Sequence, residues 1–94
     1  MVNKNIYVVA YDTPSNRRRS RINKLLLSYG GTRKNKSVFE CFTTLSKYKK
    51  MKTDLEGIVS HKKDILLIYP VCRECYPKAT FIGLPGIKPT VINV

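Results

Sequence analysis

Residues 6–15, IYVVAYDTPS, decide the fold, because a buried strand and the start of a helix meet within them. Positions 6–11 are all apolar, and their β-branched and aromatic side chains favour a strand that is covered on both faces. This strand ends at Asp12. Thr13 then has the properties of a helix N-cap and Pro14 those of a first helical residue, so we expect a helix to follow directly.

The first helix is expected to end near Tyr29, where two glycines follow. The later elements are, in order, an extended segment that is either a short hairpin or a bent strand (32–43), a helix capped by Ser46 (to about 59), a strong strand (64–70) and two weaker strands (79–82 and 90–94). The order β-α-β-β-α-β with an added C-terminal strand predicts an α+β, ferredoxin-like fold with both helices on one face of an antiparallel sheet.

Two helices cover only one face of such a sheet, so the apolar central strands need a second layer on the other face. In a chain of 94 residues, a second copy of the chain is the simplest supplier. We therefore expect a homodimer with the sheets packed face to face. The alternative is a sheet with one face exposed to solvent, whose aromatic side chains contact RNA bases. Residues 1–83 are expected to form one domain, and 84–94 a C-terminal arm.

The composition indicates a polyanionic partner. The formal net charge is +12, and the 43% hydrophobic content excludes a disordered basic tail. Residues 1–52 hold +11 of this charge, which favours a nucleic-acid binding face over plain solvation of basic helices. The longest apolar run, 65–72, is too short for a membrane span. Three cysteines without an export signal argue for the reducing cytoplasm.

Asp12 is the first candidate for catalysis from the residues alone, because it is one of two acidic residues in the basic half. A lone carboxylate among arginines on a polyanion-binding surface suits a ligand of Mg²⁺, which binds through one or two carboxylates plus substrate phosphate. Two copies at a dimer axis would share one ion, which would activate water against a phosphodiester. A role of Asp12 as an alternative helix cap stays open.

The run NRRRSR at 16–21 lies on the first turns of the expected helix. Arg17 and Arg21 project to its wet side, where they suit backbone phosphates. Arg18 and Arg19 turn toward the sheet, close to Asp12, and would either orient the scissile phosphate or pair with Asp12.

Cys72 and Cys75 have the spacing of half a zinc knuckle, but no second pair exists and structural zinc normally needs four ligands. We expect them to be buried thiols at the end of a strand.

The assembled motifs are YVVAYD (7–12), the arginines of 17–21, LLLSYG (25–30), KSVFEC (36–41) and IYPVCREC (68–75). Together they resemble the small CRISPR-associated nuclease family, CRISPR-associated protein two, the partner of the CRISPR spacer integrase. The similarity covers about residues 5–83. It implies a ferredoxin-like homodimer with a phosphodiesterase site that depends on Mg²⁺ or Mn²⁺ at the dimer interface. It also implies that the C-terminal strand joins the partner's sheet.

The resemblance assigns roles residue by residue. The family's metal-binding aspartate falls on Asp12, and its other functional residues fall on Tyr11, Arg19, Arg21, Arg33, Ser37 and Phe39. The residues expected to bind nucleic acid are Arg17, Arg18, Arg19, Arg21, Lys24, Arg33, Lys34 and Lys36. This chain has Thr13 where the family usually has a hydrophobic residue.

The implied function is that of an endonuclease on RNA, DNA or both, in CRISPR adaptation, the capture of new spacers from foreign DNA. The alternative is a non-catalytic dimeric scaffold that holds double-stranded DNA between integrase dimers. A more distant alternative is a ribonuclease toxin of the virulence-associated D type. The residues do not distinguish RNA from DNA.

Overall fold

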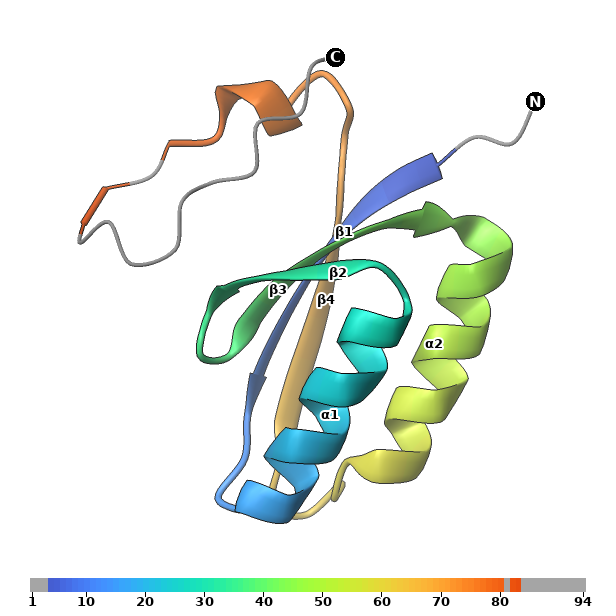
Figure 1. The fold of residues 1–94 in the computed structure, drawn as a ribbon, viewed down its shortest axis with the longest axis vertical. Coiled ribbons are helices and arrows are strands. Elements are labelled where there is room, and N and C mark those ends of the chain that lie inside the picture. The colour runs from blue at the N-terminus through green and yellow to red at the C-terminus, as the bar shows by residue number, and fades with distance from the viewer. Residues whose placement is uncertain (1–3, 81, 84–94) are drawn as a thin grey trace.

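A four-stranded antiparallel sheet carries two helices on one face (Figure 1), which confirms the expected α+β class. The structure is a computed structural model that describes residues 4–80 and 82–83. Its elements are β1 (Lys4–Asp12), α1 (Asn16–Ser28), β2 (Gly31–Asn35), β3 (Val38–Thr44), α2 (Leu45–Ile58), β4 (Ile65–Val71) and the 3₁₀ turn η1 (Tyr76–Lys78). The strand order β2-β3-β1-β4 is that of a split βαβ fold.

β1 is an inner strand of the sheet, and its pairing determines which residues lie together at each end of the sheet. At its first residue, Lys4 pairs with Thr44, directly before α2. At its last residue, Asp12 pairs with Ile65, the first residue of β4. The start of α1 therefore lies at one end of the sheet and the start of α2 at the other (Figure 1).

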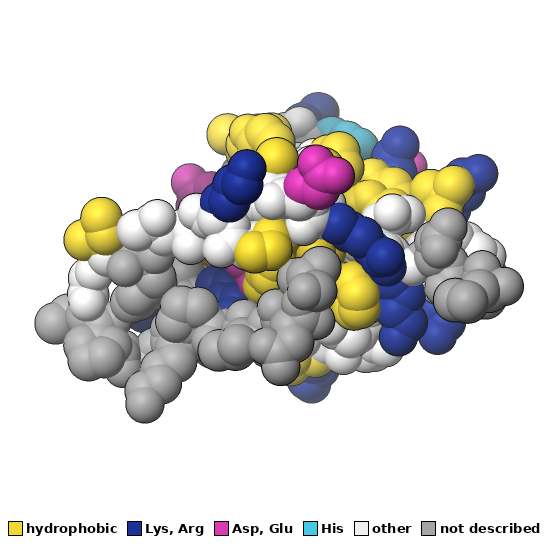
Figure 2. Space-filling model, turned by 90° about the horizontal axis from the view of Figure 1, so that it is seen from above, with side chains coloured by type: hydrophobic (Ala, Val, Ile, Leu, Met, Phe, Trp, Pro, Cys, Tyr) yellow, Lys and Arg dark blue, Asp and Glu magenta, His cyan; other side chains and the backbone are white. Residues whose placement is uncertain are grey.

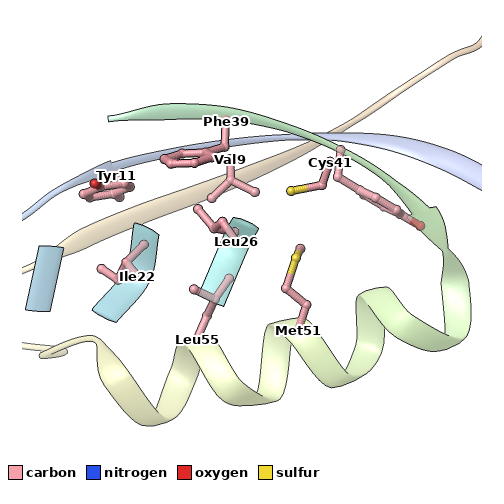
Figure 3. Packing of buried hydrophobic residues seen from close by; sticks show 9 residues of the cluster. Val9, Tyr11, Ile22, Leu26, Phe39, Cys41, Met51 and Leu55 are labelled. Carbon is pink, nitrogen blue, oxygen red and sulfur yellow. The ribbon is translucent and has the colours of Figure 1, made fainter. Parts of the chain in front are cut away.

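The core lies between the sheet and the helices (Figure 3). Side chains alternate between the two faces of a strand, so every second residue of β1 and β3 points to the helices. The fully buried members of this layer are Val9, Ile22, Leu26, Phe39, Cys41 and Met51. Burial raises the pKa of the Cys41 thiol to about 11, so this cysteine is an unreactive part of the core.

Both helix caps differ from the prediction. Ser15 caps α1 by accepting a hydrogen bond from the Arg18 N–H, at 3.1 Å. The predicted cap, Thr13, is 2% exposed, and its hydroxyl accepts from the Ser15 N–H instead, so the chain makes one further turn before the helix. Thr44 caps α2 in place of Ser46, because β3 runs into the helix without a loop.

The segment 32–43 is the hairpin of β2 and β3, which selects one of the two alternatives left open by the sequence. Gly31 begins this hairpin because a Cβ there would lie 2.6 Å from the Leu26 carbonyl oxygen.

The strand expected at 79–82 is wrong for the described residues of that range, which lie outside any strand. The preceding chain instead forms η1, where Pro77 favours a tight turn and the buried Tyr76 lines a small cavity together with Ile6. Residue 81 and the arm 84–94, with its predicted strand 90–94, lie outside the described residues.

Candidate active site and nucleic-acid interface

Asp12 stands on the face of the sheet that the helices leave uncovered. Its neighbour Tyr11 points into the core, so the alternation of the strand turns the Asp12 carboxylate to the opposite, outer side. The side chain is exposed, and no hydrogen bond or ion pair joins it to another residue in the part of the chain that the structure describes. Its oxygens are therefore available to a ligand.

The outer face around Asp12 is apolar. The register places Ile65 beside Asp12, Leu67 beside Ala10 and Tyr69 beside Val8. The three β4 side chains are 62%, 48% and 55% exposed, respectively. We call Ile65, Leu67 and Tyr69 the β4 patch. Such a row of large exposed hydrophobic side chains on one strand is typical of an interaction surface.

The far end of the same outer face is partly covered, although Phe42, which pairs with Ile6 there, is 39% exposed. Ile6 is 3% exposed there, and the buried Tyr76 of η1 lines the same small cavity. The Tyr76 hydroxyl donates a hydrogen bond to the Glu40 carboxylate. Burial and this acidic partner raise the pKa of Tyr76 to about 12. The turn thus lies at the Ile6 end of the outer face and leaves Asp12 and the β4 patch open.

Arg18 does not pair with Asp12, contrary to one of the two roles predicted for it. Its Nε lies 2.7 Å from Asp64 Oδ2 and its Nη2 lies 3.0 Å from Asp64 Oδ1. Asp64 immediately precedes β4, and its side chain is only 1% exposed. The hydrogen bond from Arg18 holds the pKa of this carboxyl well below its usual range. Sequence reasoning missed Asp64, because its distance of 46 residues from Arg18 leaves no local signal.

Arg19 lies at the loop that follows Asp12, as expected. Its Nη2 donates to the Thr13 carbonyl oxygen at 2.8 Å, and its Nη1 donates to Asn16 Oδ1 at 2.7 Å. Arg17 and Arg21 are exposed on α1, which confirms the solvent-facing side predicted for them, and Lys24 is exposed on the same helix. The end of the molecule at Asp12 is therefore basic.

Tyr11 and Phe39, which the resemblance assigns to the site, both lie in the core (Figure 3). Phe39 is completely buried. The Tyr11 hydroxyl donates to Asn23 Oδ1 and lies 3.3 Å from the Lys36 carbonyl oxygen, and burial raises the pKa of Tyr11. These two side chains lie on the opposite side of the sheet from Asp12, so they support the site by packing rather than by touching a ligand of Asp12.

The β2–β3 turn contributes the remaining assigned residues. The Ser37 carbonyl oxygen accepts from the Tyr11 N–H at 3.0 Å, which joins this turn to β1 one residue before Asp12. Arg33 and Lys36 are exposed beside it. Lys34 is less available than predicted, because its Nζ lies 3.5 Å from Glu40 Oε1 and its side chain is 14% exposed.

The basic half of the sequence does not form one continuous face. Lys4 and the lysines of early α2 (Lys47, Lys49 and Lys50) lie at the end of the sheet opposite Asp12, because α1 and α2 start at opposite ends. Figure 2 looks onto the lysine-rich end, where Lys and Arg side chains gather beside exposed hydrophobic ones. The arginines of α1 and the lysines of α2 are therefore two separate basic regions.

The described residues of one chain offer a metal ion only part of a ligand set. Among residues 4–80 and 82–83, no group of three or more His, Cys, Asp and Glu side chains is close enough to hold one. The free Asp12 carboxylate fits Mg²⁺ as one oxygen ligand of a site that a second carboxylate would complete.

None of the described helices is long and apolar enough to cross a membrane.

The prediction of buried thiols at 72 and 75 is wrong. Both cysteines are exposed, because they lie in a turn that the Cys75 N–H closes onto the Cys72 carbonyl oxygen at 3.0 Å. Arg73, within the turn, donates to the Lys4 carbonyl oxygen, far from Asp12 along β1.

Comparison with known proteins places this geometry in a family. The family described as CRISPR associated protein Cas2 matches residues 5–79. A protein of Thermus thermophilus named CRISPR-associated endoribonuclease Cas2 is 40% identical over 81 residues, which are 86% of this chain and 85% of that protein. A Synechocystis protein of the same name, numbered 3, is 36% identical over 82 residues, or 87% and 88% of the two chains.

Solved structures agree with the fold. The crystal structure of Streptococcus pyogenes Cas2 at pH 6.5 superposes with a TM-score of 0.76 at 26% identity, covering 83% of this chain and 99% of that one. The hypothetical protein TT1823 of Thermus thermophilus superposes with a TM-score of 0.72 at 33% identity, covering 94% and 98%. The sequence match and the shared fold together establish that this chain belongs to the Cas2 family of CRISPR-associated proteins.

Proposed function

We propose that this chain is a Mg²⁺-dependent endonuclease of CRISPR adaptation that acts as a homodimer in the cytoplasm, with the CRISPR integrase as its partner. The observation that supports this most strongly is the exposed Asp12 carboxylate, which lies without a described partner on an open apolar face at the end of the sheet where the arginine-rich α1 begins. Relatives from Thermus thermophilus and Synechocystis are named endoribonucleases, which favours RNA as one substrate. Double-stranded DNA is the other candidate.

The homodimer would form through the β4 patch. Exposed Ile, Leu and Tyr side chains lose contact with water when a second sheet packs on them, and apolar burial stabilises by about 25 cal/mol per Å². An interface between identical copies is usually two-fold, and only a residue near the two-fold axis approaches its own copy. Asp12 pairs with Ile65 at the edge of this patch, so a two-fold axis at that edge would bring Asp12 toward its copy.

The two Asp12 carboxylates would hold one Mg²⁺, or Mn²⁺ in its place, because this ion prefers oxygen ligands. When bound, the ion supplies Lewis-acid activation of water and of the phosphodiester. The chain's own part is to orient the substrate: Arg19, fixed by Thr13 and Asn16, presents a cation at the loop that follows Asp12. The exposed Arg21 and Arg17 extend this cationic surface along α1, where they suit further backbone phosphates.

The helix starts support binding of phosphate independently of cleavage. Neither α1 nor α2 has an acidic residue in its first turn. Arginines at the start of α1 and lysines early in α2 instead stand near the positive end of the helix dipole, which is unfavourable for the isolated helix. A bound polyanion would relieve this repulsion. The charge therefore also supports the second candidate, a dimeric scaffold that holds duplex DNA for the integrase without cutting it.

A cleavage assay tests the proposal. Labelled single-stranded RNA and double-stranded DNA are incubated with the wild-type chain and with Asp12→Ala, in Mg²⁺ and in EDTA. Wild type is expected to cleave in Mg²⁺ only, and Asp12→Ala to lose about 100-fold or more in rate, as expected for removing a metal ligand. The control Glu56→Ala, which removes an exposed acidic residue of α2, is expected to cleave at the wild-type rate.

Cleavage that persists in Asp12→Ala would refute the mechanism. Wild type that binds duplex DNA tightly but cuts neither substrate would favour the scaffold.

A further inference from the structure

The Asp64 carboxylate joins three segments of the chain beside the candidate site. It accepts two hydrogen bonds from the Arg18 guanidinium, at 2.7 and 3.0 Å, and one from the Ser60 N–H at 2.8 Å. The Thr13 hydroxyl is a further hydrogen-bond partner. The first turn of α1, the loop before it and the turn between α2 and β4 therefore meet at one buried acid.

Thr13 links this network to Asp12. It follows Asp12 directly and is 2% exposed, so its own position is fixed by packing. Its hydroxyl also accepts from the Ser15 N–H at 3.2 Å, and its carbonyl oxygen accepts from Arg19 Nη2 at 2.8 Å. Any shift of Thr13 would therefore move both the residue before it, Asp12, and the guanidinium of Arg19.

Asp64 and Asp12 are also connected through the sheet. Ile65, next to Asp64, pairs with Asp12 at the last position of the β1–β4 ladder. The backbone of Asp12 is thus held by its pairing with β4, and the next residue, Thr13, is held by Asp64. Replacing a buried ion pair by apolar residues is often neutral or stabilising, so such a pair is not explained by stability alone. A planar, two-pronged Arg–carboxylate contact does fix geometry.

We propose that Arg18 and Asp64 are positioning residues that act through Thr13 to hold the Asp12 carboxylate and the Arg19 guanidinium in place for the phosphodiester. This inference rests on the proposed endonuclease function for its kinetic part. Arg18 is then not a nucleic-acid ligand, although it lies within a run of arginines, because its guanidinium is committed to Asp64.

The kinetic test uses Arg18→Lys, which keeps the charge but loses the fork, and Asp64→Asn, which keeps the shape but loses the charge. Both variants are expected to lower kcat about 10-fold or more, since misplacement by ~1 Å costs up to 100-fold, and to leave KM within about threefold. The matched controls Arg73→Lys and Asp54→Asn change residues with hydrogen bonds elsewhere and are expected to retain wild-type kcat.

The sign of the Asp64→Asn effect separates positioning from binding. Removing an acid raises the net positive charge, so simple electrostatics predicts tighter nucleic-acid binding and no loss of rate. Positioning predicts a loss of kcat despite the added charge. Wild-type kcat in both Arg18→Lys and Asp64→Asn would overturn the inference.

Amide hydrogen exchange tests whether Arg18 and Asp64 fix the loop at Thr13, even if the wild-type chain cleaves nothing. The amides of Ser15, Arg18 and Arg19 donate hydrogen bonds at this loop. In both variants their protection is expected to fall about 10-fold or more beyond any fall at Val9 in the middle of β1, whose exchange follows the global stability of the fold. Equal loss at all amides would make the pair a general stability element and overturn the inference, as would unchanged protection at the loop.

Discussion

The two faces of the sheet are built from alternating residues of the same strands but differ in burial. On the covered face, Val9, Phe39 and Cys41 are fully buried against the helices. On the outer face, Ile65, Leu67 and Tyr69 are about half exposed or more, and Asp12 stands beside them. The apolar side chains are similar, but the described chain covers one face with two helices and reaches the other only near Ile6, with η1. The fold therefore depends on the covered face, and the outer face is free to assemble and to bind.

Asp64 and Asp12, at this end of the sheet, show the same contrast between a buried and an exposed side chain. Asp64, at the start of β4, is buried and hydrogen-bonded by Arg18. Asp12, across the ladder, is exposed. One carboxylate serves the structure and the other is available for a ligand. The predictions below test this division, ordered by their expected effect on the stability of the fold.

The largest effect is expected from truncation on the covered face. Phe39→Ala removes a fully buried ring and is expected to lower the free energy of unfolding by about 3–5 kcal/mol. Tyr69→Ala on the outer face is expected to cost about 1 kcal/mol or less at low protein concentration. Urea unfolding followed by circular dichroism measures both. Equal losses would mean that the two faces do not differ in what they contribute to the fold.

The next effect concerns Asp64. Arg18 lowers its pKa in the folded state, so the stabilisation is fully present above the ordinary value of 3.8 and is lost as the pH falls below it. Asp64→Asn is expected to lower Tm by on the order of 10 °C at pH 7, because it breaks a buried ion pair. The difference in Tm from wild type should shrink below about pH 4. A difference that is the same at pH 3 and pH 7 would contradict the ion pair as its source.

A smaller effect on the fold, but a large one on assembly, is expected from Leu67→Glu. Leu67 is 48% exposed, so a carboxylate there meets water in the monomer and Tm should change by no more than a few degrees. At a dimer interface the same carboxylate would be desolvated without a partner. Light scattering is expected to show a dimer for wild type and a monomer for Leu67→Glu. A dimer in both would place the interface elsewhere.

The smallest effect on stability is expected from replacing exposed basic residues. Their replacement instead tests which end of the molecule binds nucleic acid. Arg21→Ala, near Asp12, is expected to lower the slope of log K against log salt for duplex DNA by about 0.9, the loss of one phosphate contact. Lys49→Ala, at the other end, is expected to leave that slope unchanged. The reverse result would move the nucleic-acid surface to the start of α2.

Much of the fold was predictable because its signals are local. The apolar run before Asp12, the stripe of α1 with its two final glycines and the β4 run each identify an element within about ten residues. The caps were missed by two residues in each helix, because Thr13 and Ser46 fit the local rule as well as Ser15 and Thr44 do. Only burial of Thr13 and the direct join of β3 to α2 distinguish them.

The candidate site was predictable to the extent that it depends on a strand end. Asp12 and Arg19 follow from the order of strand, loop and helix. The partner of Arg18, the inward position of Tyr11 and the exposure of Cys72 and Cys75 do not, because each depends on which segments meet.

The sequence alone thus determined the order of elements, the basic charge and the family, since composition, periodicity and motifs are properties of neighbouring residues. Tertiary structure alone decided that Asp64 binds Arg18, that Asp12 faces outward beside the β4 patch and that the two basic helix starts lie at opposite ends. The physical reason is strand register: pairing Asp12 with Ile65 and Lys4 with Thr44 is a long-range choice, and it sets which side chains share a face and an end.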